Sequence, residues 1–483
     1  MSSSALTTSN SRWFAIAAFA AAAVLALAIS HDLLHMPLQV NDCLSLILDA
    51  SLSPSVRDTF YQHLSEAGHF RPLFYAEIKM LFDVANGHYA LTYRLFHSAL
   101  VCALILLFVR ALHVRDRFSL AALPLGLTVF VGIHTFLGTV KELYPVTHFL
   151  QAAVLALVAV NLTQARGRLA VDVALLVTFA LAALTLETGL LVWVIIVAAW
   201  ISGMPGSSRR TVLAATALLA AYFGVRFIWF GSGLPPADER STGFMFGVLE
   251  PAEITARFGD NLLPLRAYNV AVSMLSVLFS EPRSGVWVAT RALVRNNLAW
   301  RDIINLTASL FATGLVFFYV RDRIRTGVRR PVTLTDRHVV IFAAVLAANA
   351  VMSYSYVKDE IVGVAGALYA LPVAGAAAYF LRGLHERALT RRVAIGVTLV
   401  FLLGSAAWAT RAAGVHYVLR SQAFIQRNDW TRMERDWRQN GNWEQYASSQ
   451  PLIRQLHDEA IATPVVNPQF VPRWMERVFD IYY

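Results

Sequence analysis

The sequence predicts an all-α polytopic membrane protein with about eleven transmembrane helices, a long first outer loop and a small outer C-terminal domain. Composition is the first reason, because 57% of the 483 residues are hydrophobic and only 15% are charged, far from the average of soluble domains. The second reason is a series of eleven apolar stretches of membrane-crossing length. The third is that arginines gather in alternate connections between these stretches, as they do in cytoplasmic loops.

The first apolar stretch, 13–30, follows a short Ser/Thr-rich segment and Arg12. It resembles the apolar region of a signal peptide, but no small-residue cleavage site comes before His31, so we interpret it as an uncleaved first span. About twenty apolar residues are needed to cross a bilayer. This rule places the other ten spans at 89–110, 119–138, 146–163, 169–186, 189–203, 212–230, 303–320, 338–353, 361–381 and 393–410.

The arginine-rich connections predict the orientation of the chain. Five of them carry the residues Arg110, Arg115 and Arg117; Arg166 and Arg168; Arg209 and Arg210; six arginines within 321–337; and Arg382, Arg387, Arg391 and Arg392. With eleven spans and a cytoplasmic N-terminus, all five connections lie in the cytoplasm. The outer face then carries the loops 31–88 and 231–302 and a periplasmic C-terminus.

Two domains follow from this topology. Residues 1–410 are expected to form the transmembrane domain, and residues 411–483, which are too polar for lipid, a small outer domain. Residues 266–281 are apolar enough to enter the membrane, but counting them as a span reverses the orientation of everything downstream. We therefore interpret them as a re-entrant or interfacial helix within the outer loop.

All three lysines of the chain, Lys79, Lys141 and Lys358, fall on the predicted outer face. The positive-inside rule predicts the opposite placement, so their position suggests an anion site there, together with Arg71. Two of them lie beside acids, in Lys141-Glu142 and Lys358-Asp359-Glu360. The alternative interpretation is that each lysine extends to the membrane interface and pairs with its neighbouring acid.

Acidic residues at the outer ends of spans are the candidates for chemistry. Asp42 is either a catalytic carboxylate or an ordinary helix N-cap, although Asn41 offers an alternative cap. Glu142 and Glu187 are candidate second acids, because carboxylates at such positions are costly unless they are partnered or functional. For Glu187, whose neighbours are nearly all apolar, a buried structural acid is the alternative.

Other classes of site find less support. The basic residues are scattered at span ends rather than clustered, which argues against a nucleic-acid surface. Cys43 and Cys102 have no metal-type spacing. His134 and His148 lack the spacing that places two ligands on one helix face, which argues against zinc.

These features resemble the GT-C superfamily of polyprenyl-phosphate-sugar-dependent glycosyltransferases, in particular its protein O-mannosyltransferases and aminoarabinose transferases. The resemblance rests on an acid just after the first span, Asp42, a long first outer loop, and the motif Arg71-Pro72-Leu73 before the second span. The loop Lys141-Glu142-Leu143-Tyr144 and Glu187 also fit. It covers roughly 13–230; beyond that it depends on the pattern of spans, the long outer loop and the outer tail.

The resemblance implies an enzyme of the cell envelope, in the bacterial inner membrane, that moves a hexosyl or pentosyl group from a polyprenyl-phosphate donor. The acceptor is a glycan, lipid or protein hydroxyl on the periplasmic face. Asp42 matches the catalytic acid of the family, and Arg71 stands where its members place a cation facing the lipid phosphate. The family often has Asp-Glu or Asp-Asp where this chain has Asn41-Asp42, and 139–145 contain no DxD or ExD motif. A divalent metal is therefore not indicated.

The residue types suit this reaction. The donor already carries phosphate as its leaving group, so one base for the acceptor and cations for the developing phosphate charge are sufficient. Asp42 serves as the base, and Arg71, Lys79 and Lys358 hold the phosphate. A single carboxylate with in-line displacement predicts inversion at the anomeric carbon.

Two other classes of function are alternatives. A transporter is disfavoured, because the polar residues lie at the ends of the spans rather than at mid-membrane. Nothing in the sequence excludes a non-catalytic membrane scaffold whose outer tail binds a partner.

Overall fold

The computed structural model describes residues 3–40, 42–65, 70–141, 145–231, 241–242, 248–280, 290, 292–326, 331–355, 357–386, 390–441 and 450–465. Within these ranges the chain is helical apart from its connections and one short antiparallel pair, β1 (Ser241–Thr242) and β2 (Val248–Leu249).

Seven of the described helices are long and apolar enough to cross a membrane. They are α1 (Ser3–Leu34), α5 (Tyr89–Leu112), α11 (Arg209–Phe223) with its continuation η2 (Gly224–Trp229), α15 (Trp300–Thr326), α16 (Leu334–Met352), α17 (Gly363–Glu386) and α18 (Arg391–Gln439). An eighth span is formed if α6 (Arg117–Gly132) and α7 (His134–Lys141), bent by 52°, count as one. These helices confirm the prediction of a polytopic α-helical membrane protein.

The remaining predicted spans fall on shorter helices, so the number eleven stays a prediction. They are α8 (His148–Thr163), α9 (Leu169–Thr185) and α10 (Leu191–Ile201), with 16, 17 and 11 residues. The 3₁₀ turn η1 (Glu187–Leu190) joins α9 to α10. The segment 266–281 is largely covered by α13 (Leu263–Phe279), which follows the short helix α12 (Pro251–Phe258).

The bundle is packed around α17, which lies against α6, α15 and α16. Small residues permit the close approach: a Cβ on Gly126 would lie 2.9 Å from the Cβ of Ala374, and one on Gly366 would lie 1.8 Å from Oγ1 of Thr135. Three helices, α6, α11 and α16, begin with a capping side chain at an arginine-rich end. Asp116, for example, accepts hydrogen bonds from the backbone of Phe118 and Ser119 at the start of α6.

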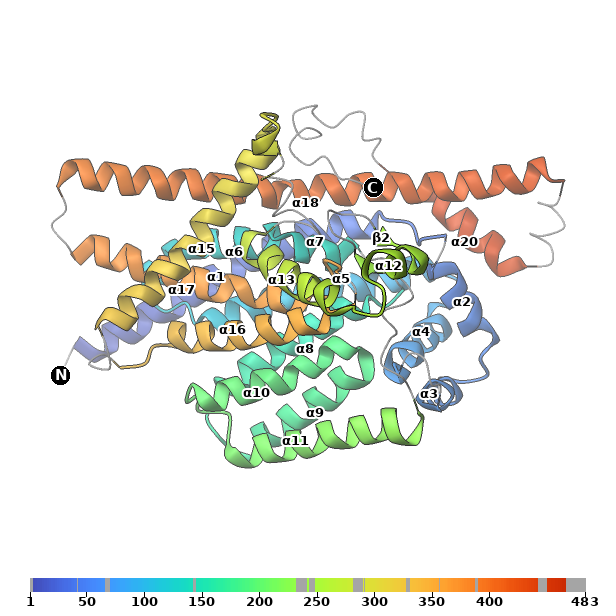
Figure 1. Ribbon diagram of the computed structural model, residues 1–483, viewed down its shortest axis with the longest axis horizontal. Helices are drawn as coiled ribbons and strands as arrows, with labels where there is room; N and C mark the ends of the chain where they lie inside the picture. The colour runs from blue at the N-terminus through green and yellow to red at the C-terminus, as the bar shows by residue number, and fades with distance from the viewer. Residues whose placement is uncertain are drawn as a thin grey trace.

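The predicted first outer loop, at 31–88, forms most of a second small core at the end of the molecule away from the arginine-rich connections. Its helices are α2 (Asp42–Leu52), α3 (Val56–Ser65) and α4 (Pro72–Ala85), and α20 (Pro451–Ala462) packs beside them. Figure 1 shows these four helices together at the right, while α1 and α18 begin at the left. The buried residues of this core include Ile47, Phe74, Tyr93, Trp430 and Leu456.

The long helix α18 is continuous across the predicted boundary at 410/411. Its 49 residues correspond to roughly 74 Å at 1.5 Å per residue, more than twice the roughly 30 Å thickness of a bilayer core. It therefore runs along the whole molecule, from the arginine-rich end to the outer helices (Figure 1). The last turns of α18 and α20 then reach the first outer loop.

Candidate functional site

Two arginines share one carboxylate at the junction between the outer loop and the membrane bundle. Nε and Nη2 of Arg71 lie 3.0 and 2.9 Å from Oε2 of Glu187. Nη2 of Arg226 lies 3.3 Å from Oε1 of the same side chain, and its Nη1 donates to the hydroxyl of Tyr222 at 2.8 Å. The structure thus brings together Arg71 and Glu187, which are 116 residues apart in sequence, and adds Arg226.

Local sequence explains how each member of this cluster is positioned. Arg71 precedes Pro72, the first residue of α4, and a residue before proline is kept out of the helical conformation. Its φ of −134° turns the chain just before the helix begins. Glu187 starts the 3₁₀ turn η1 directly after α9, and Arg226 lies in η2, a π-helical turn that continues α11. Such π turns are frequent at functional sites.

The cluster carries an excess positive charge, because two guanidinium groups face one carboxylate. The side chains of Arg71 and Glu187 are 21% and 23% exposed, and that of Arg226 is 6% exposed. Charges shielded from water interact several times more strongly than exposed ones. Nε of Arg226 is buried and has no hydrogen-bond partner in the part of the chain that the structure describes. The arrangement is therefore suited to a partly buried anion.

Asp42, the predicted base, is the first residue of α2, and its side chain is exposed. The connection before it is held on two sides. The fully buried Arg94 of α5 donates to the carbonyl oxygens of Met36 and Pro37 at 2.8 and 2.7 Å. The indole of Trp430 on α18 donates to that of Leu38 at 2.7 Å. Asp42 is thus exposed at the start of α2, a few residues after the anchored stretch 36–38.

The alternative cap, Asn41, and the candidate second acid Glu142 both lie outside the described residues. Glu142 directly follows Lys141, the last residue of α7. On the other side of the loop that holds Glu142, the chain is buried: Val146, Thr147 and His148 lead into α8 and are all buried.

Lys79 and Lys358 each face a carboxylate of their own. Nζ of Lys79 lies 2.8 Å from Oδ1 of Asp83, one turn further along α4, and Nζ of Lys358 lies 3.4 Å from Oε1 of Glu360. Eight residues of α4 separate Lys79 from Arg71, roughly 12 Å along the helix axis. Lys79 is therefore about two helical turns away from Arg71, and the phosphate-binding role of both lysines stays a prediction.

Glu77 is a further acid of the outer loop that sequence reasoning missed. Its Oε2 accepts a hydrogen bond of 2.6 Å from Nε2 of Gln151 on α8. Burial raises the pKa of the Glu77 carboxyl from 4.5 to about 7. Between the same two helices, α4 and α8, the ring of Phe74 lies against the ring of His148, with 4.5 Å between the ring centroids. A carboxyl group that titrates near neutrality therefore lies two turns along α4 from Arg71.

Sequence signals existed for several of the missed residues. Arg94 and Arg226 are single charges inside apolar stretches, a position that is expensive and indicates a specific partner. Asp32, near the end of α1, is buried and contacts both His416 and Arg420 of α18, the latter at 3.1 Å. Its partners lie almost 400 residues away in sequence, so only the fold identifies this contact.

Two hollows in the bundle lie away from the residues around Glu187. One is between α6, α17 and α18, and the other is near His113 and His338 at the arginine-rich end. In the described ranges, no group of three or more His, Cys, Asp or Glu side chains is arranged to hold a metal ion. The sequence matches no protein-family model, and no curated protein or solved structure matches the chain.

Proposed function

We propose that this integral membrane protein is a glycosyltransferase that moves a sugar from a polyprenyl-phosphate donor to an acceptor hydroxyl at the outer-loop face. The observation that carries the proposal is the partly buried cluster of Arg71, Arg226 and Glu187. Its net charge is positive, and it lies where the first outer loop meets the membrane bundle. A lipid-linked phosphate would approach from that level of the membrane.

The chemistry assigns a role to each group. The carboxylate of Asp42 removes the proton of the acceptor hydroxyl, and the acceptor oxygen forms a bond to the anomeric carbon. The bond between that carbon and the phosphate oxygen breaks, and its electron pair leaves with the phosphate. Arg71 and Arg226 stabilise the charge that develops there, while Glu187 orients both guanidinium groups. Displacement in a single step inverts the anomeric carbon.

Lys79 and Lys358 have a secondary place in this proposal. Each is held by its own carboxylate, Asp83 or Glu360, and contributes to the phosphate site only if that ion pair opens when the donor binds. A divalent metal is not required, because the two guanidinium groups already supply positive charge. We further propose that the protein resides in a bacterial inner membrane, with the N-terminus cytoplasmic and the outer loop periplasmic.

The direct test is transfer by the purified full-length protein from a panel of radiolabelled polyprenyl-phosphate sugars to envelope glycan, lipid and protein acceptors. We expect one donor to support transfer, with inversion at the anomeric carbon. The same panel is run with the chain carrying Arg71→Gln and Arg226→Gln together, after its folding has been checked by thermal unfolding. No transfer from any donor by folded wild-type protein would overturn the proposal and favour the scaffold alternative.

A further inference from the structure

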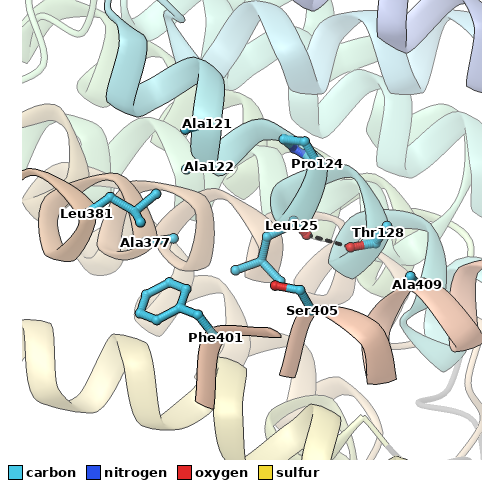
Figure 2. Close-up of a pocket in the computed structure, with 10 residues that line it drawn as sticks. All are labelled: Ala121, Ala122, Pro124, Leu125, Thr128, Ala377, Leu381, Phe401, Ser405 and Ala409. Carbon is cyan, nitrogen blue, oxygen red and sulfur yellow. Dashed lines mark hydrogen bonds between the residues drawn. The ribbon is translucent and has the colours of Figure 1, made fainter. Parts of the chain in front are cut away.

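An apolar groove opens on the side of the bundle between α6, α17 and α18. Figure 2 shows Leu125 of α6, Leu381 of α17 and Phe401 of α18 around it. Its volume is about 300 Å³, and its lining along α18 extends from Phe401 to Ala409, a length of roughly 12 Å. Ala121 and Ala409 at its rim are exposed, so the groove is open to the surrounding lipid.

The sequence explains why this groove exists. Four alanines, Ala121, Ala122, Ala377 and Ala409, line it where larger side chains would close it. Pro124 interrupts the hydrogen-bond ladder of α6, because proline has no backbone N–H to donate to the preceding turn. The hydroxyl of Thr128 donates to the carbonyl oxygen of Leu125 at 3.0 Å (Figure 2). Apart from the hydroxyl of Ser405, the lining therefore presents mainly carbon, which favours a hydrocarbon chain over water.

Positive charge lies one helical turn beyond the arginine-rich end of the groove. Arg117 is four residues before Ala121 on α6, and Arg382 directly follows Leu381 on α17. Nη2 of Arg117 donates to Nε2 of His385 at 2.7 Å, and Nη2 of Arg382 lies 2.6 Å from Oδ2 of Asp116. Both guanidinium groups also lie within 6 Å of the Phe118 ring, at 4.8 and 5.6 Å.

Three arginines at this end, Arg115, Arg117 and Arg382, outnumber the two acids Asp116 and Glu386. Asp116 is the carboxylate that pairs with Arg382, and its other oxygen caps the start of α6. Among the described residues, Arg117 contacts the imidazole of His385 rather than a carboxylate. Both arginines are exposed, Arg382 by 46%. A headgroup at this level of the membrane thus meets two cations beside the open end of an apolar groove.

We propose that this site binds an anionic phospholipid from the leaflet at the arginine-rich end, with its phosphate on Arg117 and Arg382 and one acyl chain in the groove. Basic pockets between transmembrane helices recognise acidic headgroups in this way. A zwitterionic lipid would bring its own cation towards the two arginines, so the site discriminates by headgroup charge. This site is independent of the proposed transferase cluster, which lies at the opposite end of the bundle.

The test is a lipid titration of the delipidated full-length protein, with native mass spectrometry of detergent micelles as the readout. Dioleoyl-phosphatidylglycerol is the probe and dioleoyl-phosphatidylcholine the comparison. We expect a tightly retained phosphatidylglycerol on the wild-type protein and at least tenfold weaker retention of phosphatidylcholine. Removal of both charges by Arg117→Gln and Arg382→Gln should weaken phosphatidylglycerol binding roughly twenty-five-fold, about fivefold for each arginine.

Two matched controls separate the site from general surface effects. Arg209→Gln with Arg210→Gln removes the same charge from exposed positions at the start of α11 and should leave binding unchanged. Ala409→Phe fills the groove and should also lower retention, whereas Ala406→Phe, an exposed residue of α18 outside the lining, should not. Unfolding temperatures in detergent without lipid show whether each variant folds. If the double glutamine variant does not fold, Arg117→Lys with Arg382→Lys tests the site while it preserves the charge.

Three results would overturn the proposal. The first is equal retention of phosphatidylglycerol and phosphatidylcholine by the wild-type protein. The second is an equal loss in the α11 control, which would indicate general surface charge. The third is unchanged binding in folded Ala409→Phe, which would remove the acyl chain from the groove.

Discussion

The indole Nε1 of Trp430 donates a hydrogen bond of 2.7 Å to the carbonyl oxygen of Leu38, 392 residues earlier in the chain. Trp430 is fully buried, and it joins α18 to the connection that precedes Asp42. We expect Trp430→Phe to preserve much of the packing but to leave the Leu38 carbonyl unpaired. An unpaired buried acceptor costs about 1–3 kcal/mol.

Thermal unfolding in detergent measures this cost, and Trp300→Phe is the control because Trp300 is 73% exposed. If both variants unfold at the wild-type temperature, the contact does not stabilise the outer loop.

Asp42→Asn should abolish transfer while the protein still inserts and folds. The change is nearly isosteric at an exposed residue, the first of α2, so the unfolding temperature should move little. Loss of a positioned base should lower the rate by at least about a hundredfold. Asp49→Asn, at another exposed position of the same helix, is the matched control. Near-wild-type activity in Asp42→Asn would mean that Asp42 is only a helix cap.

Arg71→Gln should slow transfer by roughly ten- to a hundredfold, because one charge-assisted contact to a shielded phosphate is worth about 1.5–3 kcal/mol. Part of this loss should appear in kcat, since the phosphate gains charge as its bond breaks. Arg71→Lys keeps the charge but loses the planar fork, so an intermediate rate is expected.

The double variant Arg71→Gln with Glu187→Gln distinguishes two roles of Arg71, binding of the phosphate and neutralisation of Glu187. If Arg71 serves only to neutralise Glu187, removing both charges should restore activity. If Arg71 binds phosphate, transfer remains slow in the double variant. Stability should recover only in part in either case, because the buried Arg226 loses its carboxylate partner.

Stability should depend on the ionisation of Glu77. The folded protein holds this carboxyl with a pKa near 7, above its ordinary 4.5, so between these two pH values the folded state binds a proton that the unfolded chain has released. Stability therefore falls as the pH rises through this window and levels off above about pH 7. In Glu77→Gln, stability should change less with pH across this window.

Unfolding temperature against pH checks this prediction, with Glu253→Gln as a control at a half-exposed acid on α12. Identical profiles for the wild-type protein and Glu77→Gln would show that Glu77 titrates normally.

The proposed orientation places the outer helices and the C-terminus in the periplasm. A C-terminal alkaline phosphatase fusion should be active, and a C-terminal green fluorescent protein fusion should be dark. A matched fusion after Arg210, in an arginine-rich connection, should show the reverse. Reversed results at both points would show the opposite orientation, and a reversal at the C-terminus alone an error in the number of spans.

Apolar spans could be predicted from the sequence because the bilayer imposes one length and one chemistry on every crossing. The predictions at 89–110 and 361–381, for example, each fall on a single long helix, α5 and α17. The boundary predicted at 410/411 falls inside one continuous helix, and the division into two domains stays a prediction. Lipid determines where apolar residues stop, but a helix does not need to end there, and α18 continues.

The candidate site was only partly accessible from the sequence. Arg71 and Glu187 were identified separately, from a short motif and from an acid among apolar residues, but their contact depends on the packing of α4 against α9. Arg226 joins them because of a π-helical turn, which has no sequence signature of its own. The three lysines share one predicted face, yet local acids rather than a common anion determine the ion pairs of Lys79 and Lys358.

The unbroken length of α18 has a mechanical consequence. The helix has no interruption between Phe401 in the groove and Trp430 beneath the outer loop. These two positions are therefore joined by about 44 Å of continuous helix. If α18 tilted by 10° about Phe401, Trp430 would move sideways by roughly 8 Å. The tilt of a transmembrane helix responds to bilayer thickness. A change in bilayer thickness that tilted α18 would therefore displace the connection that presents Asp42.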